Sequence, residues 1–351
     1  MSPSTGRLRP ATSILAGVVD GLLEASVFGS FSRIGYACRS RIGRWDELPR
    51  LEGKVMVVTG ASSGIGRAVA LELARLGADL WLVGRDEQRL EAAQRTAIAC
   101  RGGGRVMTAT VDLVDPDAVG SFARRLSGSE NRLDGLVHNA GALFTDYRTA
   151  LDGTELTLAT HVLAPFRLSY LLAPLLRHAP SSVIVTVSSG GMYTQRFDLD
   201  QLELTAGTYR GVTAYARAKR AQVVLAHEWA RRWSADGVVS YAMHPGWVET
   251  PGLATNLPSF ARLGPLLRSP EQGADTVVWL AADGPRHRAA TSSPPLATQE
   301  RCGGIWLDRH RRHEYYLPTT YRRPADRRRE GKALWAWCFE RTTRDSRSPR
   351  V

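Results

Sequence analysis

The segment KVMVVTGASSGIG, residues 54–66, joins an apolar, β-branched run to three closely spaced glycines. The run predicts a buried strand, and residues 64–77 continue with the periodicity of a helix. Gly60 permits a tight turn, Gly64 lets a phosphate approach the backbone, and Gly66 lets the helix pack closely on the strand. The helix N-terminus then offers free N–H groups to a pyrophosphate. Because the glycines directly follow a predicted strand, we expect a dinucleotide-binding turn here.

Short strand-like runs alternate with longer helical patterns from this segment onward. We expect strands at residues 54–60, 79–84, 105–112, 133–141, 181–190, 237–246 and 303–308. Strands separated by helical crossovers form a parallel sheet that helices cover on both faces. The predicted fold class is therefore α/β, a doubly wound parallel sheet, in one domain of residues 51–308. Residues 1–50 are expected as an amphipathic extension, and residues 309–351 as a loosely patterned Arg-rich tail with a short helix near 331–341.

The composition is that of a soluble globular protein, with 43% hydrophobic and 23% charged residues. Cys38, Cys100, Cys302 and Cys338 lie far apart and form no CxxC pair or Cys–His cluster. This spacing predicts neither a disulfide framework nor a metal site, and it is typical of a protein in a reducing cytoplasm. No N-terminal segment has the pattern of a secretory leader.

The net charge of +12 is concentrated at the two ends of the chain. Residues 301–351 contain 14 Lys/Arg against 6 Asp/Glu, and residues 1–50 contain 7 against 4. Basic ends of this kind suit an anionic membrane surface, or they simply maintain solubility. They do not predict nucleic-acid binding, because no nucleic-acid module and no regular aromatic interleaving accompanies them.

Both ends also contain amphipathic helical patterns. Within residues 13–28, a polar stripe with Asp20 and Glu24 opposes an apolar stripe of Leu15, Val18, Val19, Leu22 and Leu23. Near the other end, one face holds Leu334, Trp335, Cys338 and Phe339. Such helices either dock on the core or close a substrate pocket, within one subunit or across a homo-oligomer, or they attach reversibly to anionic lipid. The N-terminal pattern is too short and too charged to span a membrane.

Two irregular stretches, residues 190–212 and 246–269, follow predicted strand ends. In open parallel sheets the ligand binds beyond the carboxyl ends of the strands, so these stretches are candidate walls of a substrate pocket. They carry the apolar residues Met192, Tyr193, Phe197, Trp247 and Leu253. This lining favours a lipophilic small-molecule substrate.

The end of the second predicted strand bears on the choice of cofactor. It reads Gly84-Arg85-Asp86. A carboxylate at this place accepts the ribose 2′-OH of NAD, whereas an arginine suits the 2′-phosphate of NADP. Charge complementarity of Arg85 with a phosphate favours NADP over NAD. The alternative is that Arg85 only covers the next helix.

Tyr215 and Lys219 are four residues apart in a helical pattern and so share a face. Lys219 is one of only three lysines in a chain that otherwise uses arginine, the others being Lys54 and Lys332. A phenol has a pKa near 10, and a nearby ammonium and cationic nicotinamide ring would lower it by stabilising the phenolate. Tyr215 would then exchange a proton with an alcohol or carbonyl oxygen. An exposed Tyr–Lys pair without function remains the alternative.

Further motifs stand at the other strand ends. They are HNAG at residues 138–141, VTVSSGG at 185–191 and HPGWVET at 244–250. With the glycine turn and the Tyr-Lys pair, this order resembles the short-chain dehydrogenase/reductase family over about residues 52–308, which implies a Rossmann fold. The finer stretches SSGGM, AKRAQVVLAHEWA and HPGWVETPG resemble the dehydrogenase/reductase SDR family member 12 group most.

The resemblance implies roles for individual residues. Tyr215 would be the general acid/base, Lys219 its pKa-lowering and ribose-binding partner, and Ser189, with Ser188 as the fallback, the group that binds the reacting oxygen. The implied cofactor site has five residues at the pyrophosphate, two at the adenine, one at the ribose and a Pro-Gly turn with a hydroxyl at the nicotinamide. In that order they are Gly60, Ser62, Gly64, Ile65, Gly66, Asp112, Leu113, Asn139, Pro245 and Thr250.

One position departs from the family pattern. Many members have an asparagine in the helix after the fourth strand, where it belongs to a proton relay to the lysine. In the stretch LATHVLAPFRL, His161 occupies that place. A histidine is larger and titrates, so it either packs passively in an active enzyme or weakens the relay.

Two functions of different class follow. The first is an NADP-dependent oxidoreductase that moves a hydride between nicotinamide and a carbonyl or secondary alcohol of a lipophilic small molecule. The second is an NADP-binding regulatory or membrane-associated protein with little turnover. Intact Ser189, Tyr215 and Lys219 favour the first, while His161 and the basic ends favour the second. The expected location is cytoplasmic, with peripheral membrane contact through the ends as an open alternative.

Overall fold

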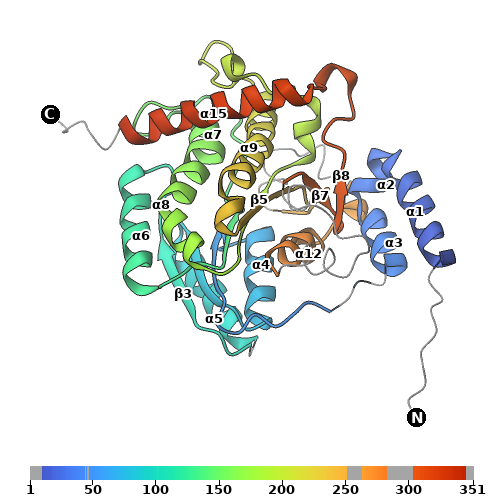
Figure 1. The fold of residues 1–351 in the computed structure, drawn as a ribbon, viewed down its shortest axis with the longest axis horizontal. Helices are drawn as coiled ribbons and strands as arrows, with labels where there is room; N and C mark the ends of the chain where they lie inside the picture. Colours follow the sequence, from blue (N-terminus) through green and yellow to red (C-terminus); the bar gives the residue numbers. More distant parts are fainter. Residues whose placement is uncertain are drawn as a thin grey trace.

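An eight-stranded sheet forms the centre of the computed structural model, which describes residues 10–43, 45, 47–100, 102–250, 263–282 and 303–344 (Figure 1). The strand order is β3-β2-β1-β4-β5-β6-β7-β8. The strands are β1 Val55–Thr59, β2 Asp79–Gly84, β3 Val106–Thr110, β4 Gly135–His138, β5 Ser182–Val187, β6 Val238–Met243, β7 Ile305–Leu307 and β8 His310–Arg312. All neighbours pair in parallel except β7 and β8. The predicted doubly wound α/β fold is confirmed, and all seven expected strands lie within their predicted ranges.

Helices cover both faces of the sheet and form two separate cores with it. On one face lie α4 Gly64–Arg75, α5 Glu87–Ala99 and α12 Pro270–Ala281. On the other lie α6 Pro116–Ser129, α8 Ala164–His178 and α9 Gly211–Trp233. The turn α7, Leu156–Leu158, and a π-helical turn, Ala159–Leu163, lead into α8. Both faces are dry, so the strands read as continuous apolar runs such as the fully buried VMVVT of β1.

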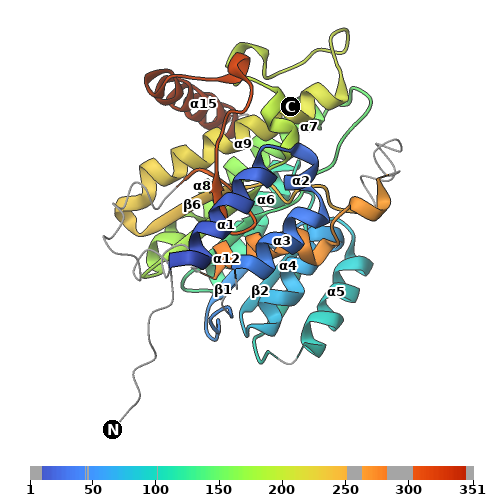
Figure 2. The ribbon, with the colours of Figure 1, turned by 90° about the vertical axis from the view of Figure 1, so that its right-hand side faces the viewer.

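The N-terminal region forms three helices, α1 Pro10–Glu24, α2 Val27–Phe31 and α3 Arg33–Gly43, beside the edge strand β8 (Figure 2). The expectation of a single helix over residues 13–28 is wrong, because α1 ends at Glu24 and α2 begins at Val27. Ser26 ends α1 in extended backbone, and its side chain caps α2 by accepting from the Gly29 N–H. Helix α1 docks through its acidic stripe: Asp20 pairs with Arg39 at 2.6 Å and with Arg312 at 2.7 Å.

A buried carboxylate joins these helices to the sheet. Asp308 accepts from both terminal nitrogens of Arg268 at 2.6 and 2.9 Å and from Arg39 at 2.8 Å. The three side chains are at most 2% exposed. Burial raises the pKa of Asp308, but Arg268 and Arg39 outweigh it and hold that pKa below the usual value. Arg268 and Arg39 also donate to the Ser30 carbonyl in α2.

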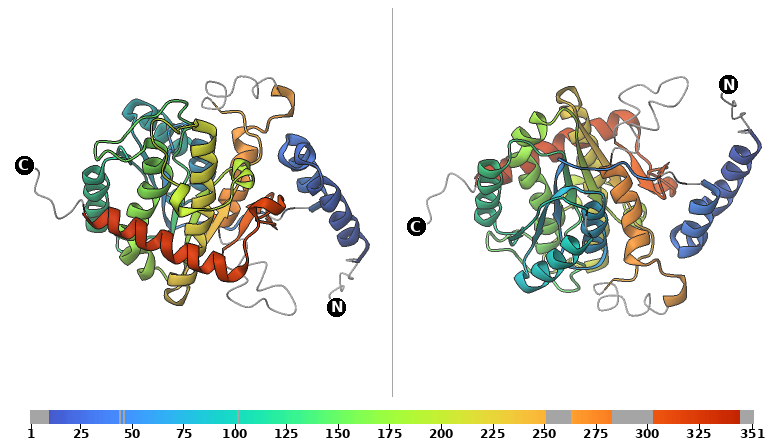
Figure 3. Two further views of the ribbon diagram at one scale, coloured as in Figure 1. Left: turned by 90° about the horizontal axis from the view of Figure 1, so that it is seen from above. Right: turned by 90° about the horizontal axis from the view of Figure 1, so that it is seen from below.

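The chain beyond residue 308 is more ordered than expected. It turns back through Asp308 and Arg309, both at positive φ, to form β8 antiparallel to β7. Helix α15 spans Pro324–Arg344, longer than the expected helix near 331–341, and it lies across α9 (Figure 3). The loosely patterned tail is thus a wrong expectation for residues 309–344, because Leu334 and Cys338 are fully buried in the core on that face. In the structure both end segments contact the rest of the chain, α1 through Arg312 and α15 through Leu334 and Cys338.

We expect Asp308→Asn to lower the free energy of unfolding by ~3 kcal/mol, because the buried Arg268 loses its counter-charge, while Arg39 keeps only Asp20 and Glu24. Asparagine tolerates the left-handed backbone of residue 308, where φ is 53°, so the turn itself is not strained. Thermal and urea unfolding measure the effect. Asp326→Asn is the control, since it removes a pair with the 79%-exposed Arg329 and should change little. Equal effects of the two variants would contradict a central role for Asp308.

Candidate active site

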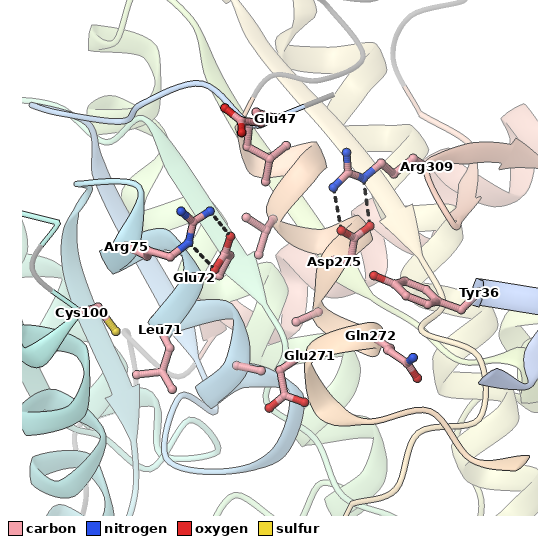
Figure 4. Close-up of a pocket in the computed structure, with 14 residues that line it drawn as sticks. Tyr36, Glu47, Leu71, Glu72, Arg75, Cys100, Glu271, Gln272, Asp275 and Arg309 are labelled. Atoms are coloured by element: carbon pink, nitrogen blue, oxygen red, sulfur yellow. Dashed lines mark hydrogen bonds and ion pairs between the residues drawn. The ribbon is translucent and has the colours of Figure 1, made fainter. Parts of the chain in front are cut away.

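A cavity of about 1160 Å³ opens at the carboxyl ends of the central strands. Every site residue expected from the sequence lines it, with the exception of Gly66. A second cavity of about 390 Å³ lies between α4, α12 and Tyr36 of α3 (Figure 4). In this second cavity Glu72 pairs with Arg75, and Asp275 pairs with Arg309. Ser189, Tyr215 and Lys219 are not among its lining residues. The larger cavity is therefore the candidate active site.

The glycine turn between β1 and α4 is packed against Asn139. Gly60 and Gly64 have φ of +67° and +52°, which favours glycine at both. A Cβ on Gly66 would collide with the Gly60 carbonyl and the Asn139 amide, so Gly66 serves close packing and not the cavity wall. The Asn139 amide donates to the carbonyls of Thr59 and Gly60 at 3.1 and 3.3 Å. Asn139 thus fixes the shape of the turn from the end of β4.

The N-terminus of α4 suits a pyrophosphate. Its N-cap residue, Ser63, makes no side-chain hydrogen bond to the first turn, and no acidic residue lies in that turn. Ser62, Ser63, Gly64 and Ile65 at this helix start line the cavity. Free amide donors and the positive helix end fit the diphosphate of a dinucleotide.

Arg85 and Asp86 differ in how they are engaged. Asp86 caps α5, where it accepts from the Arg89 N–H at 3.0 Å, and its carboxylate pairs with the Arg89 side chain. Arg85 is exposed, lines the cavity, and has no ion pair among the described residues. Farther along this wall lie Asp112 and Leu113, after β3. The Asp112 carboxylate holds its own loop by accepting from the Val114 N–H at 3.2 Å.

The end of β5 separates the roles of the two serines. The buried Ser188 hydroxyl donates to the Lys219 carbonyl at 2.9 Å, so it anchors α9. Ser189 lines the cavity, its Oγ accepts from the Gly191 N–H at 3.3 Å, and its hydroxyl favours ionisation of the nearby Tyr215 phenol. Lys219 donates through Nζ to the Val187 carbonyl at 2.9 Å, and this nitrogen lies 5.4 Å from the centre of the Tyr215 ring. Of the two serines, Ser189 is therefore the one beside Tyr215.

Burial governs the titration of the pair. It raises the pKa of Tyr215, and the Ser189 hydrogen bond only partly offsets this. Burial also lowers the pKa of Lys219 to about 7, so its charged and neutral forms coexist near neutrality. The protein alone thus does not produce the lowered phenol pKa expected from the sequence. That shift requires the positive charge on Lys219 together with a charged ring bound beside the phenol.

His161 is fully buried in the π-helical turn at the back of the cavity. Its Nε2 donates to the Ala142 carbonyl at 2.8 Å, so Nδ1 is the unprotonated nitrogen, and it has no partner among the described residues. The ring stands edge-on to Tyr215, with centroids 5.3 Å apart. Burial and then the Lys219 charge lower the pKa of His161 to about 3, which keeps it neutral. A Cβ on Gly141 would strike the imidazole, so the glycine of HNAG makes room for it.

Sequence reasoning missed Gln222. Its amide donates to the His161 carbonyl at 2.9 Å and thereby holds the π-helical turn against α9. Gln222 lies three residues after Lys219, on the same side of the helix, which is the only sequence signal that pointed to it. The motif alone gave no reason to expect a contact across to residue 161.

The apolar lining differs from the expected set. Met192, Tyr193 and Phe197 are buried in the core and are not among the lining residues of the cavity; the turn Gly190–Thr194 buries the first two. Trp247 does line it, and Leu253 lies outside the described residues. The apolar wall consists of Val27, Phe31, Leu143, Phe144, Leu151, Val212, Trp247 and Val248. Pro245 and Thr250 line the cavity between this wall and the glycine turn.

Comparison with known proteins identifies the family. The short chain dehydrogenase family model matches residues 54–259. Dehydrogenase/reductase SDR family member 12 of Bos taurus is 37% identical over 281 residues, 80% of this chain and 84% of that protein. Retinol dehydrogenase 11 of Homo sapiens is 33% identical over 232 residues, 65% of this chain and 72% of that protein. A solved structure assigned as an NAD(P)-dependent gluconate 5-dehydrogenase from Beutenbergia cavernae, with NADP at low occupancy, aligns with a TM-score of 0.57 and 28% identity over 74% of this chain and 96% of that one.

The chain belongs to the short-chain dehydrogenase/reductase family and is an NAD(P)-dependent oxidoreductase. The family resemblance seen in the motifs, including that to the member 12 group, is confirmed. Within the part of the chain that the structure describes, no group of three His, Cys, Asp or Glu side chains could hold a metal ion.

We expect His161→Asn to lower the melting temperature and to leave turnover per folded molecule near neutral pH unchanged. The shorter side chain leaves space beside Gly141 and unpairs the Ala142 carbonyl, at a cost of ~1 kcal/mol or more. Thermal unfolding and active-site-normalised rates measure the two effects. A rise in turnover at an unchanged melting temperature would instead show that residue 161 belongs to the proton relay.

Proposed function

We propose that this protein is an NADP-dependent oxidoreductase acting on the carbonyl or secondary alcohol of a lipophilic small molecule, with Tyr215 as its general acid/base. The observation that carries the proposal is the grouping of Ser189, Tyr215 and Lys219 at the wall of a cavity large enough for a dinucleotide and a substrate. Bound in this cavity, the nicotinamide would supply or accept the hydride.

The chain's own residues manage the proton. Ser189 and Tyr215 line the same cavity and interact through their hydroxyl groups, so both can bind one substrate oxygen placed between them. In reduction, Tyr215 gives its proton to that oxygen; in oxidation it removes the proton. Lys219 stabilises the phenolate electrostatically, and the Val187 carbonyl fixes the position of its ammonium.

Two features support NADP as the cofactor. The exposed guanidinium of Arg85 has no ion-pair partner among the described residues, which suits a 2′-phosphate. The neighbouring carboxylate of Asp86 is committed to capping α5, and this makes it a poorer acceptor for the ribose 2′-OH of NAD.

The apolar wall supports a lipophilic substrate. Phe144, Leu151, Val212 and Trp247 face the same cavity as Tyr215. Apolar walls with a few convergent polar groups are typical of sites that bind hydrophobic small molecules. Retinol dehydrogenase 11, a relative, carries the name of such a substrate.

A binding protein with little turnover is the second candidate. His161 favours it, because the neutral ring stands where many relatives have the relay asparagine, and Gln222 already engages the backbone carbonyl of residue 161. The grouping of Ser189 with Tyr215 favours the enzyme. NADPH oxidation with a panel of ketones and aldehydes separates the two: turnover excludes the second candidate, and tight NADPH binding without turnover excludes the first.

Replacement of Tyr215 by Phe tests the acid/base role. The ring volume is kept, so folding and NADPH binding should survive, while turnover falls by roughly a hundredfold or more. Steady-state rates and NADPH titration of the two proteins measure this. Turnover at the wild-type level in the variant would refute the role.

Arg85→Ala tests the cofactor preference. We expect NADPH affinity to fall at least about tenfold and NADH affinity to stay nearly constant, because only NADPH carries the 2′-phosphate. Fluorescence titration with both cofactors decides the question. Arg95→Ala on the outer face of α5 is the matched control, since Glu91, which is exposed, is the one ion-pair partner of Arg95 in the described part of the chain. Equal losses for both cofactors would mean that Arg85 is structural.

We also propose that the protein contacts anionic membrane surfaces through α1, α2 and the cavity mouth. Because α1 turns its acids inward, Val18 and Leu22 face outward, and Val27 and Phe28 of α2 are exposed as well. At the cavity mouth Leu151 and Val212 are exposed beside the arginines 148 and 210. Apolar side chains beside arginines that form no ion pair with the described residues suit insertion between anionic headgroups.

The spanning alternative has little support. One described helical stretch, Leu156–His178, is long and apolar enough to cross a bilayer by length and composition. However, 78% of its most apolar segment is buried inside the protein, and the stretch packs on the sheet beside α6. It is therefore a core helix.

Co-sedimentation with vesicles tests the proposed membrane contact. The full-length protein should bind phosphatidylglycerol vesicles at low salt, bind less as salt rises, and not bind phosphatidylcholine vesicles. Phe28→Asp should weaken binding several-fold, whereas Ile98→Asp on α5, at the same 58% exposure, should not. A protein that stays in the supernatant with anionic vesicles at low salt would contradict the proposal.

A further inference from the structure

The N-terminal helices contribute directly to the cavity. Phe31, the last residue of α2, is 6% exposed and lines the cavity, as does Val27 one turn earlier. The Phe31 ring lies against Gly190, the residue that follows Ser189, where a Cβ would come within 2.6 Å of it. Glycine at 190 thus lets a side chain from outside the strand-end motifs reach the backbone next to the proposed oxygen-binding group.

Aromatic neighbours fix the orientation of this ring. Phe31 packs on His244 at a centroid distance of 4.6 Å and lies edge-on to Trp247 at 6.1 Å. His244 and Trp247 flank the Pro245-Gly246 turn, which is part of the cavity wall. The Phe31 ring is therefore wedged between the ends of β5 and β6, on the substrate side of Ser189.

The backbone of Phe31 is held as firmly as its ring. Its carbonyl accepts from the Trp247 N–H at 2.8 Å and from the Arg268 side chain at 3.0 Å. The same Arg268 pairs with Asp308, as does Arg39 of α3. A Cβ on Gly246, where φ is +75°, would lie 2.5 Å from the Phe31 carbonyl oxygen. Glycines therefore allow both close contacts of Phe31, Gly190 the contact of its ring and Gly246 the contact of its carbonyl.

We propose that α2 is a wall of the substrate pocket and that Phe31 is a specificity-determining residue. Its ring limits the space beside the substrate carbonyl and keeps that side apolar. The buried Asp308 with Arg39 and Arg268 holds the wall in place. This inference rests on the proposed function, and it deepens it: ketones of small or slender apolar substituents should be preferred over those with a bulky group next to the carbonyl.

The experiment compares Phe31→Ala, Phe31→Leu and the control Phe339→Ala in α15, which lies outside the cavity lining. kcat/KM is measured at saturating NADPH for straight-chain 2-ketones and for ketones with branched or aromatic substituents beside the carbonyl. Dissociation constants of the corresponding alcohols in the NADP complex are measured by calorimetry. We expect Phe31→Ala to raise the bulky-to-slender ratio at least about tenfold, since a pocket contact of this size discriminates by that order. Phe31→Leu should raise it less, and the control should not change it.

Two readouts separate this role from a structural one. NADPH affinity should change less than about twofold in both Phe31 variants, because the ring lies on the substrate side. Equal proportional loss for all ketones, or an unchanged ratio, would overturn the proposal. If circular dichroism shows that Phe31→Ala is unfolded, the bulky-to-slender ratio of Phe31→Leu decides the question. If no ketone is turned over even by the wild type, the proposed function fails, and the ratio of the alcohol dissociation constants still decides the role of Phe31.

Discussion

Parallel strand pairing is the constraint on which the site depends. Because neighbouring strands from β1 to β7 run in the same direction, all of them end at one edge of the sheet. The residues that follow β1, β4, β5 and β6 meet there although they are up to nearly two hundred positions apart in the chain, from Gly60 to Gly246. Close packing fixes the positions of these residues relative to one another, as the contact of Gly66 with Asn139 illustrates. A helix N-terminus, a serine and a proline turn thus face one cavity.

A second constraint lies outside the family fold. Asp308, at the end of β7, is a buried carboxylate between two arginines that come from α3 and from the segment before α12. Desolvating three charges is costly, and it is compensated only when every hydrogen bond is made, as it is here through the carbonyls of Ser30 and Phe31. The network therefore specifies one position for the N-terminal helices. That position brings Phe31 to the cavity.

Tyr215 and His161 show that burial shifts pKa values away from those expected from the residue types alone. An ammonium four residues from a phenol should lower the phenol pKa, yet burial raises the pKa of Tyr215 and brings that of Lys219 to about 7. His161, which titrates near neutrality when exposed, is held neutral by the same dry surroundings. Burial thus keeps these groups in their neutral forms more than their residue types suggest.

The sequence by itself determined the fold class, the seven parallel strands and the candidate residues at their ends, because apolar periodicity and glycine spacing are local properties of the chain. It did not determine which serine faces Tyr215, since Ser188 and Ser189 differ only in the side of the strand end on which they lie. Nor did it reveal β8, the capping role of Asp86 or the contact of Gln222 with residue 161. The acidic stripe of α1 was visible in the sequence, but only the tertiary structure decided that it faces inward. Its partners Arg39 and Arg312 are 19 and 292 residues away, and no local pattern encodes a contact between such distant charges.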